Sequence, residues 1–296
     1  MRIDELPRSD RVEDRRRGGL AGVPGGRGGL GIGTVVILGL IGWALGIDPR
    51  LLIQGAETIS GSNQTQQQSD ARTGASSDAM GDFVSAVLGS TEAQWTNIFT
   101  QAGKRYTPPT LVMFSGATQS GCGSAQAAMG PFYCPIDQKV YLDTSFFQDL
   151  ERRFHGCDVG SKTCQFSQAY VIAHEIGHHV QNQLDVLPRV QEQQRGMDKA
   201  EANSLQVRVE LQADCFAGIW ANRSQKQWQF IEQGDVEAAM QTASAIGDDR
   251  LQRQSQGYVV PDAFTHGTSA QRTQWFMTGL KSGEVASCNT FRAQQQ

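Results

Sequence analysis

The chain has 296 residues, a hydrophobic fraction of 39% and a formal net charge of −4. This length is enough for one sizeable domain or two small ones, and the hydrophobic fraction can supply a core over most of it. The slightly acidic balance gives no general electrostatic attraction for nucleic acid, which is excluded as an expected partner. None of the six cysteines belongs to a Cys-x-x-Cys pair, so zinc-finger spacing is absent as well.

The first 79 residues predict a tail, a membrane anchor and a linker. The first 27 residues carry seven arginines among acids and glycines, so residues 1–29 are expected to form a disordered cytoplasmic tail. Residues 30–47 are apolar or glycine except for Thr34, which is about the minimum length for a transmembrane helix. The arginines before this run predict a single-pass helix in a bacterial inner membrane, with the N-terminus inside and the later residues periplasmic. A cleaved signal peptide is the alternative, which the length of the run disfavours. The polar stretch within residues 48–79 predicts a flexible linker.

Residues 80–292 predict one globular domain that is mainly helical with a small β element, an α+β fold. The hydrophobic pattern predicts helices at 81–103, 145–154, 167–183, 199–221, 225–254 and 269–281. Two short apolar runs, 111–114 and 139–142, predict strands. The second strand contains Tyr141 and could flank a cleft and pair with an extended peptide, with plain core packing as the alternative.

Residues 174–178 carry the most specific pattern of the chain, because they read His-Glu-Ile-Gly-His and match H-E-x-x-H. On a helix, His174 and His178 share one face, so both imidazoles can bind one metal ion. Glu175 lies about 100° around the helix from His174, where it can contact a metal-bound water without binding the metal. Zinc lowers the pKa of such a water to about 7, and a glutamate can take its proton. Gly177 would permit another element to approach closely; the alternative is a helix with merely packed histidines.

A catalytic zinc of this type needs a third protein ligand and one open position. The helical pattern over residues 207–221 places Glu210 and Asp214 four residues apart, on one face amid apolar neighbours. Unpaired carboxylates would be costly there, and a metal ion with a metal-bound histidine would satisfy both. The sequence therefore predicts one Zn²⁺ on both motif histidines and Glu210, with Asp214 accepting an N–H from a ligand histidine. A solvated acidic face, or an ion pair with Arg208, is the alternative. His179, about 140° around the helix from the first motif histidine, is expected to miss the metal.

These motifs lie among several blocks of distinctive sequence. The blocks are 121–123 (GCG), 130–135 (GPFYCP), 140–143 (VYLD), 174–181 (HEIGHHVQ), 210–220 (ELQADCFAGIW) and 256–272 (QGYVVPDAFTHGTSAQR). Together they resemble the bacterial family of neutral zinc metallopeptidases, and the pairing of H-E-x-x-H with E-x-x-x-D resembles the gluzincin arrangement. The resemblance implies a zincin-like catalytic domain with a single zinc and endopeptidase-like activity. It implies no particular natural substrate.

The last block contains a further candidate for the chemistry, His266. Thr268-x-x-Gln271 is a capping box, so a helix is expected to begin just after this histidine. His266 could donate a hydrogen bond to a developing oxyanion, or hold the substrate chain. Tyr258 and Arg272 are alternatives for the same task, and ordinary structural hydrogen bonding is the alternative for all three.

The cysteines predict disulfides if the domain lies in an oxidising compartment. Short separations favour Cys122 with Cys134 and Cys157 with Cys164, which leaves Cys215 with Cys288. The last pair is the least constrained, because Cys215 lies on the proposed ligand helix and could be a buried free thiol.

Two functions fit these features. The favoured one is a membrane-anchored zinc-dependent endopeptidase that acts on peptides or unfolded proteins, with Glu175 as general base. The alternative is a binding or chaperone-like membrane protein with a non-catalytic zinc. Glu175 separates the two, since a structural zinc site needs its ligands but no base.

Overall fold

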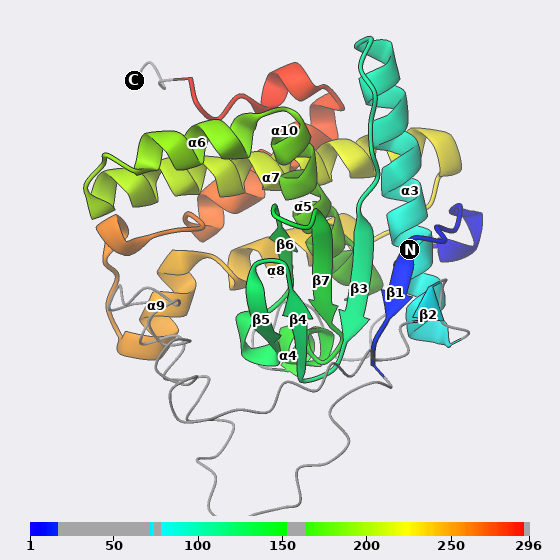
Figure 1. Ribbon diagram of the computed structural model, residues 1–296, viewed down its shortest axis with the longest axis horizontal. Coiled ribbons are helices and arrows are strands. Elements are labelled where there is room, and N and C mark those ends of the chain that lie inside the picture. Colours follow the sequence, from blue (N-terminus) through cyan, green and yellow to red (C-terminus); the bar gives the residue numbers. More distant parts are fainter. Residues whose placement is uncertain (17–71, 74–77, 153–163, 293–296) are drawn as a thin grey trace, which may run out of the picture.

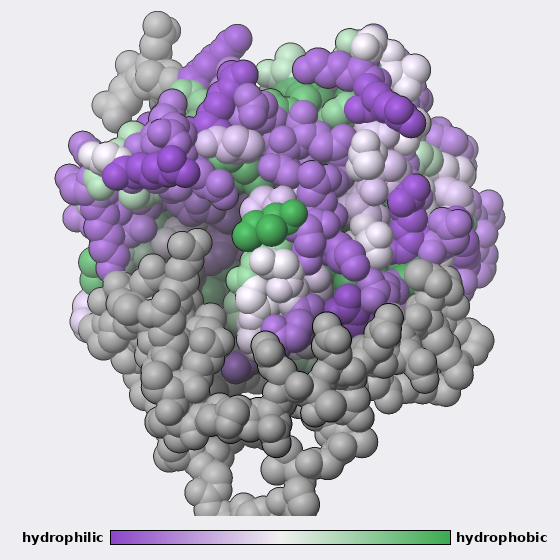
Figure 2. Space-filling view, in the orientation of Figure 1, coloured by the Kyte–Doolittle hydropathy of each residue, from purple (hydrophilic) through white to green (hydrophobic). Residues whose placement is uncertain are grey.

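The computed structural model describes residues 1–16, 72–73, 78–152 and 164–292 (Figure 1). These residues form mainly helices with two small sheets, which confirms the expected α+β class. Figure 1 shows the central sheet in front, with α6, α7 and α10 across the top of the view and α3 to one side. The face seen in Figure 2 is mostly hydrophilic, as expected for a fold whose large apolar side chains are mostly in the core.

The central sheet has the strand order β2-β1-β3-β7-β6. Its strands are β1 (Val12–Asp14), β2 (Arg72–Thr73), β3 (Thr110–Phe114), β6 (Phe132–Cys134) and β7 (Lys139–Asp143). β3 is parallel to β1 and β7, whereas β2 and β6 at the two ends are antiparallel to their neighbours. Both predicted strands are confirmed as β3 and β7, and their continuous apolar runs fit central strands that are buried on both faces.

A second, two-stranded sheet is the hairpin of β4 (Ala117–Ser120) and β5 (Gly123–Gln126). Its turn contains Cys122, which forms a disulfide with Cys134 of β6 and so joins the two sheets. Gly123 after the turn has a φ of 113°, a conformation that side-chain-bearing residues rarely adopt. The hairpin was not expected, because its strands are short and largely polar.

Three helices build the frame of the candidate site: α5 (Cys164–Gln183), α7 (Lys199–Trp228) and α10 (Ser269–Ser282). The α7 and α10 backbones touch, because a Cβ at Gly218 would overlap the carbonyl of Phe276 and one at Gly279 would overlap that of Cys215. The other helices are α3 (Ala79–Gln101), α4 (Phe146–Arg152), α6 (Val186–Gln194), α8 (Asp235–Ala245) and α9 (Asp248–Gln256). Short 3₁₀ turns occur at Ile3–Glu5, Ala127–Met129, Pro261–Ala263 and Val285–Cys288.

The single helix predicted over residues 225–254 is wrong. α7 continues to Trp228, and the chain then breaks before α8 and again before α9. Gly234 adopts a φ of 89° at the first break, which is incompatible with a continuing right-handed helix. At the second break, Gly247 lies against the backbone of Ser269, so that a Cβ there would clash. The prediction used hydrophobic periodicity alone, which does not indicate that the helix breaks at these two glycines.

The disordered tail predicted for residues 1–29 is also wrong over residues 1–16, which belong to the domain. β1 is an inner strand of the central sheet, and Leu6 and Val12 are buried in its core. Some of the arginines that suggested a tail form ion pairs instead: Arg8 bonds Asp82 at 2.8 Å, and Arg15 bonds Glu13 at 2.8 Å. A three-residue strand is too short to produce a hydrophobic period, so the arginine content dominated the prediction.

The described part of the chain contains no helix that is both long and apolar enough to span a membrane. The predicted span, residues 30–47, lies outside the described residues, as does most of the predicted linker, residues 48–79. Two residues of that linker, Arg72 and Thr73, form β2 beside β1. The domain's helix α3 begins at residue 79, where the Asp78 side chain accepts a hydrogen bond from Gly81 N–H and caps the helix.

Candidate metal centre

α5 carries the H-E-x-x-H residues as predicted; His174 and Glu175 are buried, and His178 is partly exposed. His174 is 6% exposed and Glu175 8% exposed, while Tyr170 and Ile176 are fully buried. Gly177 lies directly against α7, because a Cβ at this position would lie 3.0 Å from the carbonyl oxygen of Ala213. The expected close approach at Gly177 is therefore found, and it is α7 that approaches.

The predicted donor set of His174, His178 and Glu210 converges on one point. Glu210 Oε2 lies 3.2 Å from His174 Nε2 and 3.4 Å from His178 Nε2. All three ligand atoms lie within 4.8 Å of one another. Zinc bonds of about 2.0–2.2 Å in a tetrahedron place ligand atoms roughly 3.3 Å apart, and the two distances from Glu210 to the imidazoles match this spacing. The α7 face that carries Glu210 and Asp214 thus lies against the histidines of α5, as predicted.

Each ligand histidine has its second ring nitrogen held by a neighbouring acceptor. His174 Nδ1–H donates to Asp214 Oδ1 at 2.8 Å, and His178 Nδ1–H donates to Gln181 Oε1 at 2.9 Å. When each imidazole is neutral with its proton on Nδ1, its Nε2 is the acceptor that can bind a cation. The Asp214 contact was predicted. Gln181 was missed, although its spacing of three residues after His178 on one helix could have indicated it.

Asp214 is the centre of a fully buried hydrogen-bond cluster. Besides His174, it accepts from the Tyr170 hydroxyl at 2.6 Å and from Arg272 Nε and Nη2 at 2.9 Å each. Arg272 is 3% exposed. Its guanidinium is engaged by Asp214 and the carbonyl oxygen of Ile246, which disfavours the alternative role of Arg272 at an oxyanion. The ion pair that Asp214 forms is with Arg272, not with Arg208.

Charge interactions within the cluster set the pKa values of its members. Burial alone would lower the pKa of His174, but its interactions with Asp214 and Glu210 together outweigh burial and raise it to about 10. Burial likewise opposes protonation of His178, and Glu210 nonetheless raises the pKa of this imidazole above its usual value. The two imidazoles in turn hold the pKa of Glu210 well below its ordinary range, against the effect of its burial. A cation that binds at this site must therefore displace protons from the imidazoles.

Glu175 is placed beside the donor set but does not belong to it. Burial raises the pKa of its carboxyl group, while the positive charges of His174 and His178 lower it; the net shift is upward. A carboxylate whose pKa lies above the normal value is better suited to accept a proton near neutral pH.

His266 lies near the donor set, and its ring is oriented by Asp248, the first residue of α9. Asp248 Oδ1 contacts His266 Nδ1 at 3.4 Å, and Oδ2 accepts the backbone N–H groups of Thr265, His266 and Gly267 at 2.6–3.0 Å. Electrostatic attraction from His266 contributes to lowering the pKa values of Glu175 and Glu210. The predicted capping box of α10 is present just after it. Asp248 was missed, since nothing local marks it as a partner of a residue eighteen positions later.

Tyr258, the remaining alternative to His266, is 62% exposed on the segment after α9. His179 misses the metal as predicted, because its ring is fully buried against other groups. Its Nδ1 lies 3.1 Å from the Tyr133 hydroxyl and its Nε2 lies 2.7 Å from the carbonyl oxygen of Thr107. Burial lowers the pKa of His179 to about 4, so this imidazole is neutral near pH 7. Tyr141 is 1% exposed on β7, between β3 and β6, so core packing is correct and peptide pairing by its strand is wrong.

Two of the three predicted disulfides are confirmed. Cys122 bonds Cys134, and Cys215 bonds Cys288. Cys164 is also disulfide-bonded, but Cys157, its predicted partner, lies outside the described residues. The Cys215 bond joins α7 to the 3₁₀ turn after α10, and so fixes the chain's C-terminal part to the ligand helix.

His174, His178 and Glu210, on two packed helices with a glutamate beside them, form a donor set that could hold a single metal ion. Comparison with known proteins agrees with a metal site. A sequence model of the family described as "Putative neutral zinc metallopeptidase" matches residues 1–291, and the chain belongs to this family.

Its relatives include proteins from distant bacteria. "Uncharacterized protein YpfJ" of Escherichia coli K12 is 46% identical over 299 residues, which cover 98% of this chain and 99% of that protein. "Uncharacterized protein Rv2575" of Mycobacterium tuberculosis H37Rv is 44% identical over 197 residues, or 64% of each chain. No solved structure matches the fold.

Proposed function

We propose that this protein is a zinc-dependent endopeptidase. The observation that carries the proposal is the convergence of His174 Nε2, His178 Nε2 and Glu210 Oε2, with the Glu175 carboxylate buried beside them. The donor set fits zinc, and family membership implies the same metal. The alternative of a non-catalytic zinc protein is disfavoured, because a structural site gains nothing from burying Glu175 next to its ligands.

The residues have distinct parts in the proposed hydrolysis. Bound zinc would supply a water with a pKa of about 7 and would polarise the substrate carbonyl. Glu175 accepts the water's proton as the oxygen attacks the peptide carbon, and then delivers that proton to the leaving amine. His266, whose Nδ1 contacts Thr265 Oγ1 and Asp248, would supply a hydrogen bond to the oxyanion. Asp214 and Gln181 keep the ligand imidazoles in the tautomer with Nε2 free.

Cleavage of an unfolded protein by the purified full chain tests this function. The zinc-loaded chain is expected to cleave a reduced, unfolded protein substrate. Cleavage should stop when a chelator removes the metal and resume when zinc is added. Fragments are measured by mass spectrometry. Equal cleavage with and without chelator would indicate a contaminating protease or another mechanism, and no cleavage by a chain that holds zinc would favour the non-catalytic alternative.

We also propose that the domain is extracytoplasmic and that residues 1–16 lie on the same side of the membrane as the metal centre. The disulfides support an oxidising compartment. β1 pairs with β3 on one side and with β2 on the other. A single crossing at residues 30–47 with a cytoplasmic N-terminus would separate β1 from its partners by a bilayer. The single crossing predicted for residues 30–47 is therefore not part of this proposal.

Thiol labelling in spheroplasts of cells that make the full chain tests this arrangement. Asp4→Cys and Lys199→Cys place thiols at two exposed positions, one before the apolar run and one on α7. A membrane-impermeant maleimide is expected to label both to the same extent before lysis. Labelling of Lys199→Cys alone would instead support the cytoplasmic N-terminus that the sequence predicts. Protection of both until lysis would keep them on one side but place the domain in the cytoplasm.

A further inference from the structure

We propose that Gln212 is a positioning residue that acts through Gln181: it holds the His178 imidazole so that Nε2 is free for a metal ion, and it anchors this arrangement to the C-terminal part of the chain. The inference rests on the metal site of the proposed function, but not on peptidase activity. Among the contacts that the structure describes, Gln212 bonds neither a metal ligand nor Glu175. Its effect on the metal centre is therefore exerted through Gln181.

A chain of hydrogen bonds leads from the ligand helix α5 across α7 to residue 288. His178 Nδ1–H donates to Gln181 Oε1 at 2.9 Å. Gln181 Nε2 donates to Gln212 Oε1 at 3.0 Å and to the carbonyl oxygen of Val209 at 2.7 Å. Gln212 Nε2 donates in turn to the carbonyl oxygen of Cys288 at 3.0 Å. Both glutamines and Cys288 are buried, so each of these polar groups depends on its partners in the chain.

Two backbone carbonyl oxygens fix the direction of this chain of bonds, because a carbonyl oxygen can only accept. The Cys288 oxygen requires the Gln212 amide to turn its nitrogen toward residue 288 and its oxygen toward Gln181. The Gln181 amide must then present its nitrogen to Gln212 and Val209, so its oxygen faces the imidazole. That oxygen needs a proton on His178 Nδ1, and Nε2 of the neutral ring is then the acceptor.

Gln212 contributes because one bond does not satisfy the Gln181 amide. The amide nitrogen carries two protons, and each needs an acceptor when the group is buried. Val209 supplies one acceptor and Gln212 supplies the other. Without Gln212, one buried N–H of Gln181 lacks a partner, which favours rotation of the amide away from His178. The imidazole would then lose the acceptor that holds its Nδ1 proton.

The Cys288 carbonyl oxygen is held in place by contacts with α7 on both sides of Gln212. Cys288 forms the disulfide with Cys215, three residues after Gln212. The Thr290 hydroxyl donates at 2.6 Å to the carbonyl oxygen of Arg208, four residues before Gln212. The segment that contains residues 288 and 290 is thus fixed along α7 where Gln212 lies. It gives the chain of bonds a rigid end.

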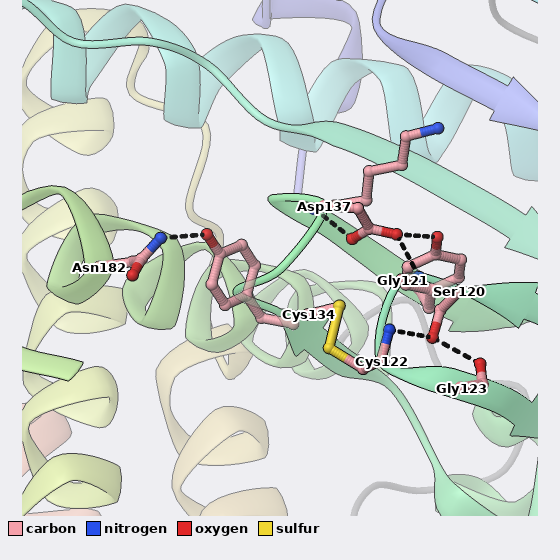
Figure 3. Close-up of a disulfide and its surroundings, with 10 residues drawn as sticks. Ser120, Gly121, Cys122, Gly123, Cys134, Asp137 and Asn182 are labelled. Carbon is pink, nitrogen blue, oxygen red and sulfur yellow. Dashed lines mark hydrogen bonds between the residues drawn. A yellow bond between two sulfur atoms is a disulfide. The ribbon is translucent and has the colours of Figure 1, made fainter. Parts of the chain in front are cut away.

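The disulfide between Cys122 and Cys134 shows that contact with α5 alone does not create such a link (Figure 3). Next to Cys134, the Tyr133 hydroxyl accepts from Asn182 Nδ2–H of α5 at 3.0 Å. Neither Tyr133 nor Asn182 bonds a metal ligand among the hydrogen bonds of the described residues. The disulfide that is linked to a ligand histidine is therefore the one at Cys288.

Gln212→Met tests the role, because methionine has a similar length and volume but lacks the amide group. Gln94→Met is the matched control. Gln94 lies on α3, is also buried, and donates its amide to another glutamine of α7, Gln227, at 2.8 Å. No described hydrogen bond leads from that pair to a metal ligand. Both changes replace a buried glutamine by methionine and break one glutamine pair.

The zinc dissociation constant of the full chain is measured by competition with a chromophoric chelator, which needs no peptidase activity. Gln212→Met is expected to weaken zinc binding by about 10-fold, the lower end of what changes beside metal ligands cause. Gln94→Met should bind zinc like the parent, even where its metal-free form unfolds at a lower temperature. Zinc binding by Gln212→Met that equals the parent's would overturn the positioning role, whether or not the protein cleaves peptides.

A double-mutant cycle with Gln181→Met separates positioning from a general structural effect. If Gln212 acts through Gln181, the double variant should bind zinc no more weakly than Gln181→Met alone. Losses that add would show that Gln212 affects the site by another route, and would also overturn the proposal. A parent that binds zinc but cleaves nothing would reject the endopeptidase function and leave the positioning role in place. A parent that binds no zinc would reject both.

Discussion

Glu175→Gln is expected to bind zinc like the parent and to lose turnover by about 10²–10⁴-fold or more. The carboxylate is not one of the three converging ligand atoms, so its removal leaves the donor set intact. Glutamine has nearly the same shape, and a site that is 8% exposed can accept it without a cavity. The amide cannot accept the proton of the attacking water, and this step is lost. Turnover is measured under zinc saturation, with metal content determined by mass spectrometry.

Glu192→Gln is the matched control for this change. Glu192 is an exposed glutamate on α6, paired with Arg195 at the surface, and its replacement should leave both zinc content and turnover at the parent level. If Glu175→Gln cleaves substrate as well as the parent does, the general-base mechanism is wrong whatever the metal content.

Glu210→Ala and His174→Ala are expected to lose the metal itself. Each change deletes one of three ligand atoms, and Glu210 is the only carboxylate among them. Without it, the two imidazoles offer a neutral site that holds a divalent cation weakly. Zinc bound per chain after dialysis against a weak chelator should fall to a small fraction of the parent value, and activity should fall with it.

A smaller loss of zinc affinity is expected when Asp214 is changed, because Asp214 contacts a ligand histidine and not the metal itself. Asp214→Asn keeps the volume of the side chain but withdraws the charge that holds His174 Nδ1–H and pairs with Arg272. Zinc affinity should weaken by about 10–100-fold, less than for loss of a ligand.

The outcome that would contradict the Glu210 prediction is full zinc retention in Glu210→Ala. It would show that the third ligand lies elsewhere, although the class of site could survive.

The metal centre could be predicted because its chemistry repeats at helical spacing. His174 and His178 share a face by the geometry of one helix, and Glu210 and Asp214 do so on another. Nothing in the sequence states that the two faces meet. The apolar surroundings of the carboxylates and the glycine at position 177 indicated it, and the contact between Gly177 and Ala213 bears that out.

Residues that act across long separations could not be found in the same way. Asp248 on α9 contacts His266 in the segment before α10, and Arg272 reaches Asp214 across 58 positions of sequence. β1 is a three-residue strand whose only apolar residue is Val12. Its place in the sheet comes from pairing with β3, a tertiary contact that overrides local composition. Arg8, one of the arginines that suggested a tail, pairs with Asp82, a carboxylate distant in sequence.

The most direct test of the central claim is the ratio of turnover to bound zinc in Glu175→Gln, measured beside the parent and Glu210→Ala on one unfolded protein substrate. A catalytic zinc site predicts that Glu175→Gln holds one zinc per chain and is nearly inactive, while Glu210→Ala lacks both zinc and activity. A Glu175→Gln chain that holds zinc and cleaves at the parent rate would contradict the account.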